Sequence, residues 1–136
     1  MLIHCQMKTI VPSFLILFSL TVHSEWELSS SVEGNTVYID DSLIKVTGRF
    51  VKVLEIVDSN TPTEPEEGKK YLSSKVLVEY DCPIGKLRIH SFIAFSDNMG
   101  KGSIVYTEKN PTPWVKVLDN SNGYNIYQIV CKKSLI

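Results

Sequence analysis

Apolar and polar residues alternate along most of the chain, which is the period of a half-buried β-strand. In the segment Leu72–Cys82, for example, Val76, Val78 and Tyr80 fall on one face. Such runs recur with short turn sequences between them, so the pattern predicts a sheet. The expected strands are Thr36–Ile39, Ile44–Val57, Leu72–Cys82, Leu87–Phe95, Ser103–Thr107 and Trp114–Leu118.

The sequences between these runs predict how the strands connect. Residues 82–85 (Cys-Pro-Ile-Gly) separate two alternating runs, so we expect those two strands to pair antiparallel as a hairpin. Residues 58–70 hold acids, prolines and a glycine but no apolar residue, which predicts a loop. Within Ile44–Val57 the apolar positions change phase after Phe50, which indicates a bulge or a strand buried on both faces.

The last part of the chain changes to a helical period. Its apolar residues are spaced mainly by three and four: Ile126, Tyr127, Ile129, Val130 and Cys131. Residues 119–121 (Asp-Asn-Ser) offer N-cap candidates, and Lys132 and Lys133 stand where the helix dipole favours cations. We therefore expect one C-terminal helix over Asn122–Lys133, packed on a mainly antiparallel sheet, which makes the fold class α+β.

The N-terminus carries an apolar run preceded by one positive charge, Lys8. A positive residue, an apolar stretch of roughly 7–15 residues and small residues before the cut define a secretory signal peptide. Residues 1–24 are therefore predicted to be a signal peptide cleaved after Ser24, and residues 25–136 a single domain. A membrane anchor is the alternative, but the fourteen apolar residues Thr9–Val22 reach only about 21 Å as a helix, short of a hydrocarbon core of roughly 30 Å.

Export makes the cysteines informative. Cys5 lies before the cut, so the exported chain keeps Cys82 and Cys131, and two cysteines in an oxidising compartment predict one disulfide. A metal site would need more cysteine and histidine ligands than His90 adds, and no Cys-x-x-Cys redox motif occurs. Glu25 stands where a lipid-bearing cysteine would follow the apolar run, so we do not expect a lipoprotein.

Composition and charge exclude several classes of function. The 136 residues are 43% hydrophobic with a formal net charge of −1, which is typical of a globular protein and gives no support for bulk binding to nucleic acid or an anionic membrane. No nucleotide-binding loop, zinc-protease motif, nucleophile elbow or calcium loop occurs. We therefore expect no enzyme, no cofactor and no metal site.

Few single residues suggest chemistry. His90 shares a polar strand face with basic residues, and because no partner is fixed by spacing we interpret it as solvated. The adjacent acids Asp40 and Asp41 are typical of a solvated turn rather than of paired catalytic carboxylates or calcium ligands. Trp26 and Trp114 are interpreted as core residues.

One set of basic residues is a candidate partner-binding face. Its members lie in or directly next to two of the predicted strands: Lys45, Arg49, Lys52, Lys86 and Arg88. If those strands are neighbours, the five side chains form a basic stripe that could meet an acidic partner. An ordinary charged outer face of the sheet is the alternative interpretation.

Several short motifs follow one another in a characteristic order. They are Trp26-Glu27-Leu28, Tyr38-Ile39-Asp40, Val78–Cys82, Lys86–Ile89 and Trp114–Lys132. In these motifs the chain resembles the surface-adhesin protein E family of Gram-negative bacteria, which are small exported domains. The resemblance implies an antiparallel sheet with a C-terminal helix, the bridge between Cys82 and Cys131, and adhesion to host extracellular-matrix proteins. A surface lipoprotein of this kind would carry a lipid-bearing cysteine, so residence in the periplasm stays open.

Three classes of function follow from the sequence. The first is an exported, non-enzymatic binding module that meets a host-matrix or envelope protein through an exposed sheet face or edge. The second is a periplasmic accessory or inhibitor domain that acts on an envelope protein. The third is a small hydrolase, for which no assembled acid–base set is visible. Self-association into a homodimer is compatible with each of them.

Overall fold

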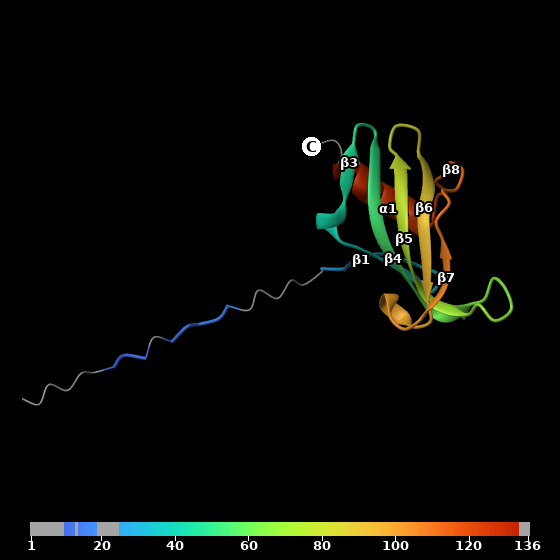
Figure 1. The fold of residues 1–136 in the computed structure, drawn as a ribbon. Helices are drawn as coiled ribbons and strands as arrows, with labels where there is room; N and C mark the ends of the chain where they lie inside the picture. The colour runs from blue at the N-terminus through green and yellow to red at the C-terminus, as the bar shows by residue number, and fades with distance from the viewer. Residues whose placement is uncertain (1–9, 13, 19–24, 134–136) are drawn as a thin grey trace, which may run out of the picture.

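A computed structural model describes residues 10–12, 14–18 and 25–133. Within them, eight antiparallel strands form one sheet, and a C-terminal helix packs across one face of it (Figure 1). This confirms the predicted α+β fold class. The described part of the predicted signal peptide is exposed and extends away from the sheet, whereas the predicted cleavage position lies outside the described residues. No helix among the described residues is long and apolar enough to cross a membrane.

The sheet has the strand order β1-β2-β4-β5-β6-β7, with β3 paired to β4 and β8 paired to β6. The strands are β1 (Glu27–Val32), β2 (Asn35–Ile39), β3 (Lys45–Thr47), β4 (Phe50–Thr63), β5 (Tyr71–Asp81), β6 (Lys86–Phe95), β7 (Ile104–Glu108) and β8 (Val115–Lys116). Two 3₁₀ turns, η1 (Asp41–Leu43) and η2 (Asn98–Gly100), and the helix α1 (Asn122–Lys133) complete the described elements. The predicted hairpin between β5 and β6 and the predicted helix are confirmed.

The hydrophobic core lies between α1 and the central strands. Valines and one isoleucine at alternate positions of β2, β4 and β5 face the helix, and Ile126 and Val130, one helical turn apart, fill the space above them. The helix begins where predicted, because the Ser121 hydroxyl accepts a hydrogen bond from the Tyr124 backbone N–H at 3.1 Å. Burial of this apolar layer supplies the main driving force for folding.

Both halves of α1 are held to the sheet. In the first half, Ser30 of β1 donates to Asn122 at 2.6 Å and accepts from Asn125 at 2.9 Å. In the second half, a disulfide joins Cys131 to Cys82, just after β5, with the two Cα atoms 5.6 Å apart. The predicted disulfide is therefore confirmed, and the helix is fixed at both ends.

The segment Ile44–Val57 is a correction to the sequence prediction. The chain reverses at Gly48, whose φ of 60° suits glycine, so the segment is the hairpin β3–β4 rather than one strand. The change of phase after Phe50 reflects this reversal. β4 then continues to Thr63, so the first half of the predicted loop 58–70 is strand, because its backbone pairs with β2 and β5 despite the polar side chains.

A bulge in β6 is a second correction. The register with β5 shifts by one residue at His90, between the pairs Val78–Ile89 and Leu77–Ser91. The uniform alternation predicted for Leu87–Phe95 therefore breaks, because an extra residue moves all later side chains to the other face. As a result Ile93 pairs with Lys75 on the face opposite α1.

Candidate functional site

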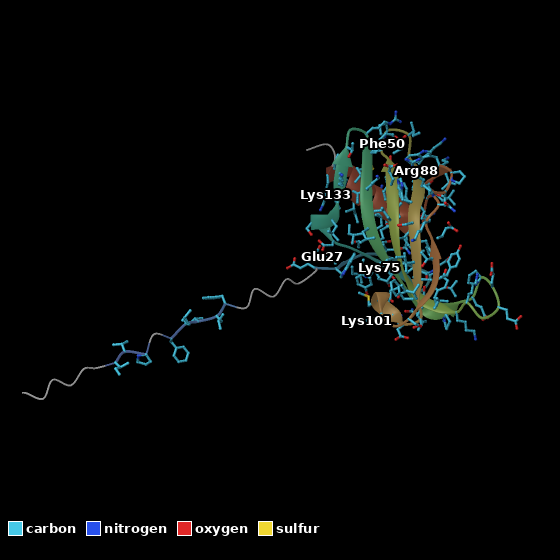
Figure 2. All side chains as sticks on the ribbon, in the orientation of Figure 1. Glu27, Phe50, Lys75, Arg88, Lys101 and Lys133 are labelled. Carbon is cyan, nitrogen blue, oxygen red and sulfur yellow. A yellow bond between two sulfur atoms is a disulfide. The ribbon has the colours of Figure 1, made fainter. Side chains whose placement is uncertain are left out.

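The face of the sheet opposite α1 carries the basic residues singled out from the sequence. Directly opposed cross-strand partners share a face, and two neighbouring rows of partners cross the sheet here. The first row is Lys45, Lys52, Glu79 and Arg88, and the second is Thr47, Phe50, Asp81, Lys86 and Lys116. Both rows lie at the end where the β3–β4 and β5–β6 hairpins turn, and Figure 2 shows Phe50 and Arg88 at this end. We call the surface formed by six of these cations the basic face: Lys45, Arg49, Lys52, Lys86, Arg88 and Lys116.

Trp114 lies over the basic face in a cluster of aromatic and arginine side chains. Its ring centroid is 5.7 Å from that of Phe50, and the Arg88 guanidinium carbon lies 4.6 Å from the Trp114 ring. Arg49 lies 5.6 Å from the Phe50 ring. Because Phe50 belongs to β4 and Trp114 precedes β8 beside β6, the two rings meet across β5. Rigid tryptophan and arginine side chains of this kind often dominate the energy of protein interfaces.

Two buried carboxylates lie under this cluster. Asp81 accepts a hydrogen bond from Nε of Arg49 at 2.8 Å and forms an ion pair with its Nη2 at the same distance. Glu79 likewise accepts a hydrogen bond from Nε of Arg88 and forms an ion pair with its Nη2, both at 2.8 Å, and Nε2 of His90 lies 3.2 Å from the same oxygen. Burial by itself raises the pKa of Glu79, but the hydrogen bonds and charges of His90 and Arg88 outweigh it, so the pKa lies below its ordinary value. The ionised Glu79 therefore fixes the orientation of Arg88.

The basic face carries an excess of positive charge. Its lysines, Lys45, Lys52, Lys86 and Lys116, make no ion pair with any described residue. The two arginines are each opposed by one carboxylate, so six cations of the described chain stand against two anions here. The whole chain has a formal net charge of −1, so its charge is distributed unevenly. A local positive potential of this kind attracts acidic partners and speeds their encounter.

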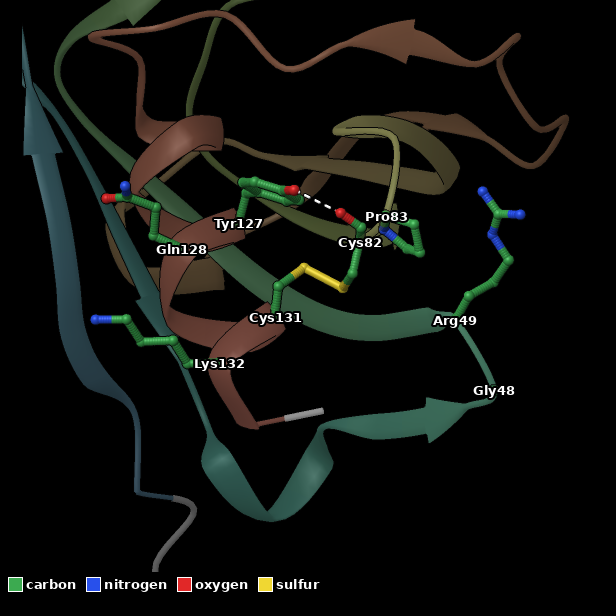
Figure 3. Close-up of a pocket in the computed structure, with 8 residues that line it drawn as sticks. All are labelled: Gly48, Arg49, Cys82, Pro83, Tyr127, Gln128, Cys131 and Lys132. Carbon is green, nitrogen blue, oxygen red and sulfur yellow. Dashed lines mark hydrogen bonds between the residues drawn. A yellow bond between two sulfur atoms is a disulfide. The ribbon is translucent and has the colours of Figure 1, made fainter. Parts of the chain in front are cut away.

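A pocket of about 420 Å³ adjoins the basic face at the hairpin turns. It is lined by Gly48, Arg49, Cys82, Pro83, Tyr127, Gln128, Cys131 and Lys132. Figure 3 shows the disulfide between the two cationic side chains, Arg49 and Lys132, which extend to opposite sides. The Tyr127 hydroxyl donates to the carbonyl oxygen of Cys82 at 2.6 Å and so fixes the ring in the wall. The pocket continues the positive character of the basic face around the end of the sheet.

The structure brings the five predicted basic residues together, although the predicted arrangement needs correction. The strands that carry Lys52 and Arg88 are not neighbours, because β5 lies between them and contributes two acids. Trp114, interpreted as a core residue, lies half-buried on the face opposite α1, next to Arg88. His90, interpreted as solvated, is half-buried against Glu79.

The sequence reasoning missed the residues that shape this site from β5. Glu79 and Asp81 alternate with Val78 and Tyr80, so the pattern already indicated that both acids point away from the core. Their pairing with Arg49 and Arg88 depends on the strand order and the register, which the pattern does not contain.

The acids considered earlier as candidates have local structural contacts. Asp40 caps η1 by accepting hydrogen bonds from the backbone N–H and the hydroxyl of Ser42, and Asp41 lies 2.6 Å from the Lys133 ammonium. Among the described residues, no group of three histidine, cysteine, aspartate or glutamate side chains could hold a metal ion.

Comparisons with known proteins give one family and one fold. A family model described as Surface-adhesin protein E matches residues 26–132. Crystal form II of Haemophilus influenzae protein E is similar in structure at 16% identity and a TM-score of 0.59, covering 79% of this chain and 94% of that chain. A second structure of that protein gives 17% identity, a TM-score of 0.56 and coverages of 78% and 89%. Protein E from non-typeable Haemophilus influenzae gives 17% identity, a TM-score of 0.52 and coverages of 76% and 79%.

At 16–17% sequence identity, the structural likeness to protein E shows that this chain has the same fold. No curated protein matches the sequence at a significant level.

Proposed function

We propose that this chain, which belongs to the surface-adhesin protein E family, is an exported, non-enzymatic binding module that meets a protein partner through its basic face. Membership of this family supports an adhesin-like binding function in general terms. The resemblance to matrix-binding adhesins makes host extracellular-matrix proteins the first partners to test. The alternative partner is an envelope protein of the periplasm.

The excess of positive charge around the Trp114 cluster carries the proposal. A binding face needs a rigid apolar centre and a charged rim that selects the partner. Here Phe50 and Trp114 supply the centre, and the four lysines of the basic face, which pair with no described carboxylate, supply the rim. The partner that complements this face has an acidic surface with an apolar patch between its carboxylates.

Charge reversal on the rim should weaken partner binding without harming the fold. In the double variant Lys45→Glu and Lys116→Glu, each new carboxylate stands opposite a lysine, Lys52 or Lys86. The variant therefore gains cross-strand ion pairs while the positive excess disappears. Binding to immobilised matrix proteins and to envelope extract, measured by surface plasmon resonance, should weaken by about tenfold or more, mostly through a slower association rate.

A matched pair of reversals elsewhere controls for net charge. Lys101→Glu and Lys109→Glu change the total charge equally at exposed positions outside the basic face and its adjoining pocket. The proposal fails if this control variant loses as much affinity as the rim variant, or if wild-type binding does not weaken with added salt. If the protein binds components of the envelope extract but no matrix protein, its partner is a periplasmic protein and not a matrix protein.

The exported protein should begin at or within a few residues of Glu25 and carry no lipid. The basis is the predicted signal peptide, whose described residues such as Phe14 and Leu17 make no packing contact with the sheet and are almost fully exposed. Intact-mass and N-terminal mass spectrometry of the exported protein measures this directly. An acylated N-terminus, or retention of the apolar run, would contradict both the cleavage and the unlipidated form.

Protease treatment of whole cells then separates surface display, which leaves the protein sensitive, from periplasmic residence, which protects it.

A further inference from the structure

A cavity of about 410 Å³ opens on the helix-covered side of the sheet, opposite the side that carries the basic face. The helix α1 begins here, and Asn122 and Gly123 of its first turn form part of the rim. Beyond the helix, side chains of β4, β5 and β6 line the cavity, and most of them are apolar. The apolar wall includes Val57, Tyr71, Val76, Ile89 and Phe92. Volume and lining are those of a small-molecule site.

Two polar side chains on the cavity wall have hydrogen-bonding capacity that the protein does not use. Glu55 is 5% exposed and accepts one hydrogen bond, from the Tyr80 hydroxyl at 3.0 Å. Ser74 is 3% exposed, and its hydroxyl makes no hydrogen bond to any described residue. No fully buried side-chain oxygen or nitrogen in the described residues lacks a partner. The second oxygen of Glu55 and the Ser74 hydroxyl therefore remain accessible, and both residues line the cavity.

The register of β4 and β5 places these two groups next to each other. Glu55 pairs with Val76, and Val57 pairs with Ser74, so Glu55 and Ser74 are diagonal neighbours on one face. Diagonal neighbours in an antiparallel pair lie roughly 7–8 Å apart at Cα, which lets one small group touch both side chains. The cavity thus has a two-point polar anchor in an apolar wall.

We propose that the cavity binds a small molecule with an apolar body and one primary ammonium group, which donates to Glu55 and Ser74. A carboxylate only accepts hydrogen bonds and a hydroxyl can accept, whereas an ammonium has three donors. The apolar body packs on the uncovered wall, and the rings of Tyr71 and Phe92, 5.8 Å apart in an edge-to-face arrangement, offer further contact to a cation. A ligand carboxylate would be repelled by Glu55. The site is separate from the basic face and does not depend on the protein-binding function.

Because Glu55 can bind a proton, the affinity for the proposed ligand should depend on pH. Burial raises the pKa of this carboxyl from 4.5 to about 7, although the Tyr80 hydrogen bond opposes the shift. The other titratable side chains that line the cavity are Tyr71 and Tyr80, which stay neutral in this range, and the residues contributed by α1, β2 and β6 are uncharged. Since the ammonium needs the ionised carboxylate, its affinity should rise by about 30-fold between about pH 5.5 and about pH 8, following the ionised fraction.

Three eight-carbon probes that differ only in the head group test the proposal. Octylamine, octanol and octanoate are titrated into the purified protein while amide NMR shifts are followed. Octylamine should bind at least about tenfold more tightly than octanol at about pH 8, with shifts centred on Val57, Ser74 and Phe92, and octanoate should not saturate. Equal affinity for octylamine and octanol, or shifts centred on the basic face, would overturn the assignment.

Two cavity variants and one control complete the test. Glu55→Gln keeps the shape of the side chain but should abolish both the preference for octylamine and its pH dependence. Ser74→Ala should weaken octylamine binding severalfold and leave octanoate excluded. Glu67→Gln removes a carboxyl from an exposed loop and should change nothing. If Glu55→Gln retains the octylamine preference, the carboxyl is not the anchor and the proposal is wrong, whatever the outcome for partner binding.

Discussion

Replacing Cys131 with alanine should lower the free energy of unfolding of the oxidised protein by about 4 kcal/mol, within a range of roughly 2–5 kcal/mol. The bridge to Cys82 spans 49 residues of sequence, and a cross-link of that length removes much of the conformational entropy of the unfolded chain. Because a domain is stabilised by only roughly 5–15 kcal/mol in total, a loss of this size should be plain in denaturant unfolding.

The loss should begin in the second half of α1. Its first half keeps the hydrogen bonds of Ser30 to the helix and of Tyr127 to Cys82, whereas the second half keeps, outside the helix itself, only packing and the exposed ion pair of Lys133 with Asp41. A helix of 12 residues is marginal by itself in water. Hydrogen exchange of the Cys131→Ala variant should therefore show the earliest loss of protection near the C-terminal end of the helix.

The matched controls are Cys82→Ala, the double variant and the reduced wild type. Either single change already removes the whole cross-link, so the double variant should be little less stable than each single one. Additive effects, or two free thiols in the purified exported protein, would show that the bridge does not form.

Glu55→Gln should stabilise the protein at neutral and alkaline pH, by up to about 3 kcal/mol at about pH 8, and have little effect near pH 4. The folded carboxyl has its pKa raised to about 7 by burial, against 4.5 in the unfolded chain. Between these values unfolding releases a proton, so rising pH favours unfolding. The stability that the neutral Glu55 contributes is therefore complete below about pH 4.5 and is lost as the pH rises through about 7.

Urea unfolding at a series of pH values measures this prediction. The difference in unfolding free energy between wild type and Glu55→Gln isolates the contribution of one carboxyl from all other titrations. It should grow from about pH 5 and level off above about pH 8. A difference that does not vary with pH would mean that Glu55 ionises normally in the folded protein, and Glu67→Gln, in an exposed loop, should show no such trend.

A carboxyl that lowers stability at physiological pH is an unusual component of a core. Buried polar groups that break the rules of packing occur most often at functional sites. Glu55 and Ser74 have unused hydrogen-bonding capacity at the wall of the same cavity, which accounts for both as parts of a binding site.

Local patterns in the sequence determined the element types. The alternation in β5 and the three-and-four spacing of the helix each depend on neighbours in the chain, so the strand Tyr71–Asp81 and the helix Asn122–Lys133 could be predicted. The disulfide followed from the cysteine content together with the predicted export. β1 was not predicted, because Ser29, Ser30 and Ser31 give it no alternation, and only pairing with β2 makes it a strand.

Only the tertiary structure decided which strands are neighbours and in what register, because those contacts join residues far apart in the chain. The placement of β5 between β4 and β6 puts Glu79 and Asp81 beneath Arg88 and Arg49. The predicted basic stripe is therefore two arginine–carboxylate pairs surrounded by lysines that make no ion pair within the described part of the chain. The sequence alone determined which residues are charged, apolar or oxidisable. The cavity beside Glu55 exists because α1 starts at Asn122 and leaves the end of the sheet uncovered, and a helix's position on a sheet is set by packing rather than by its own period.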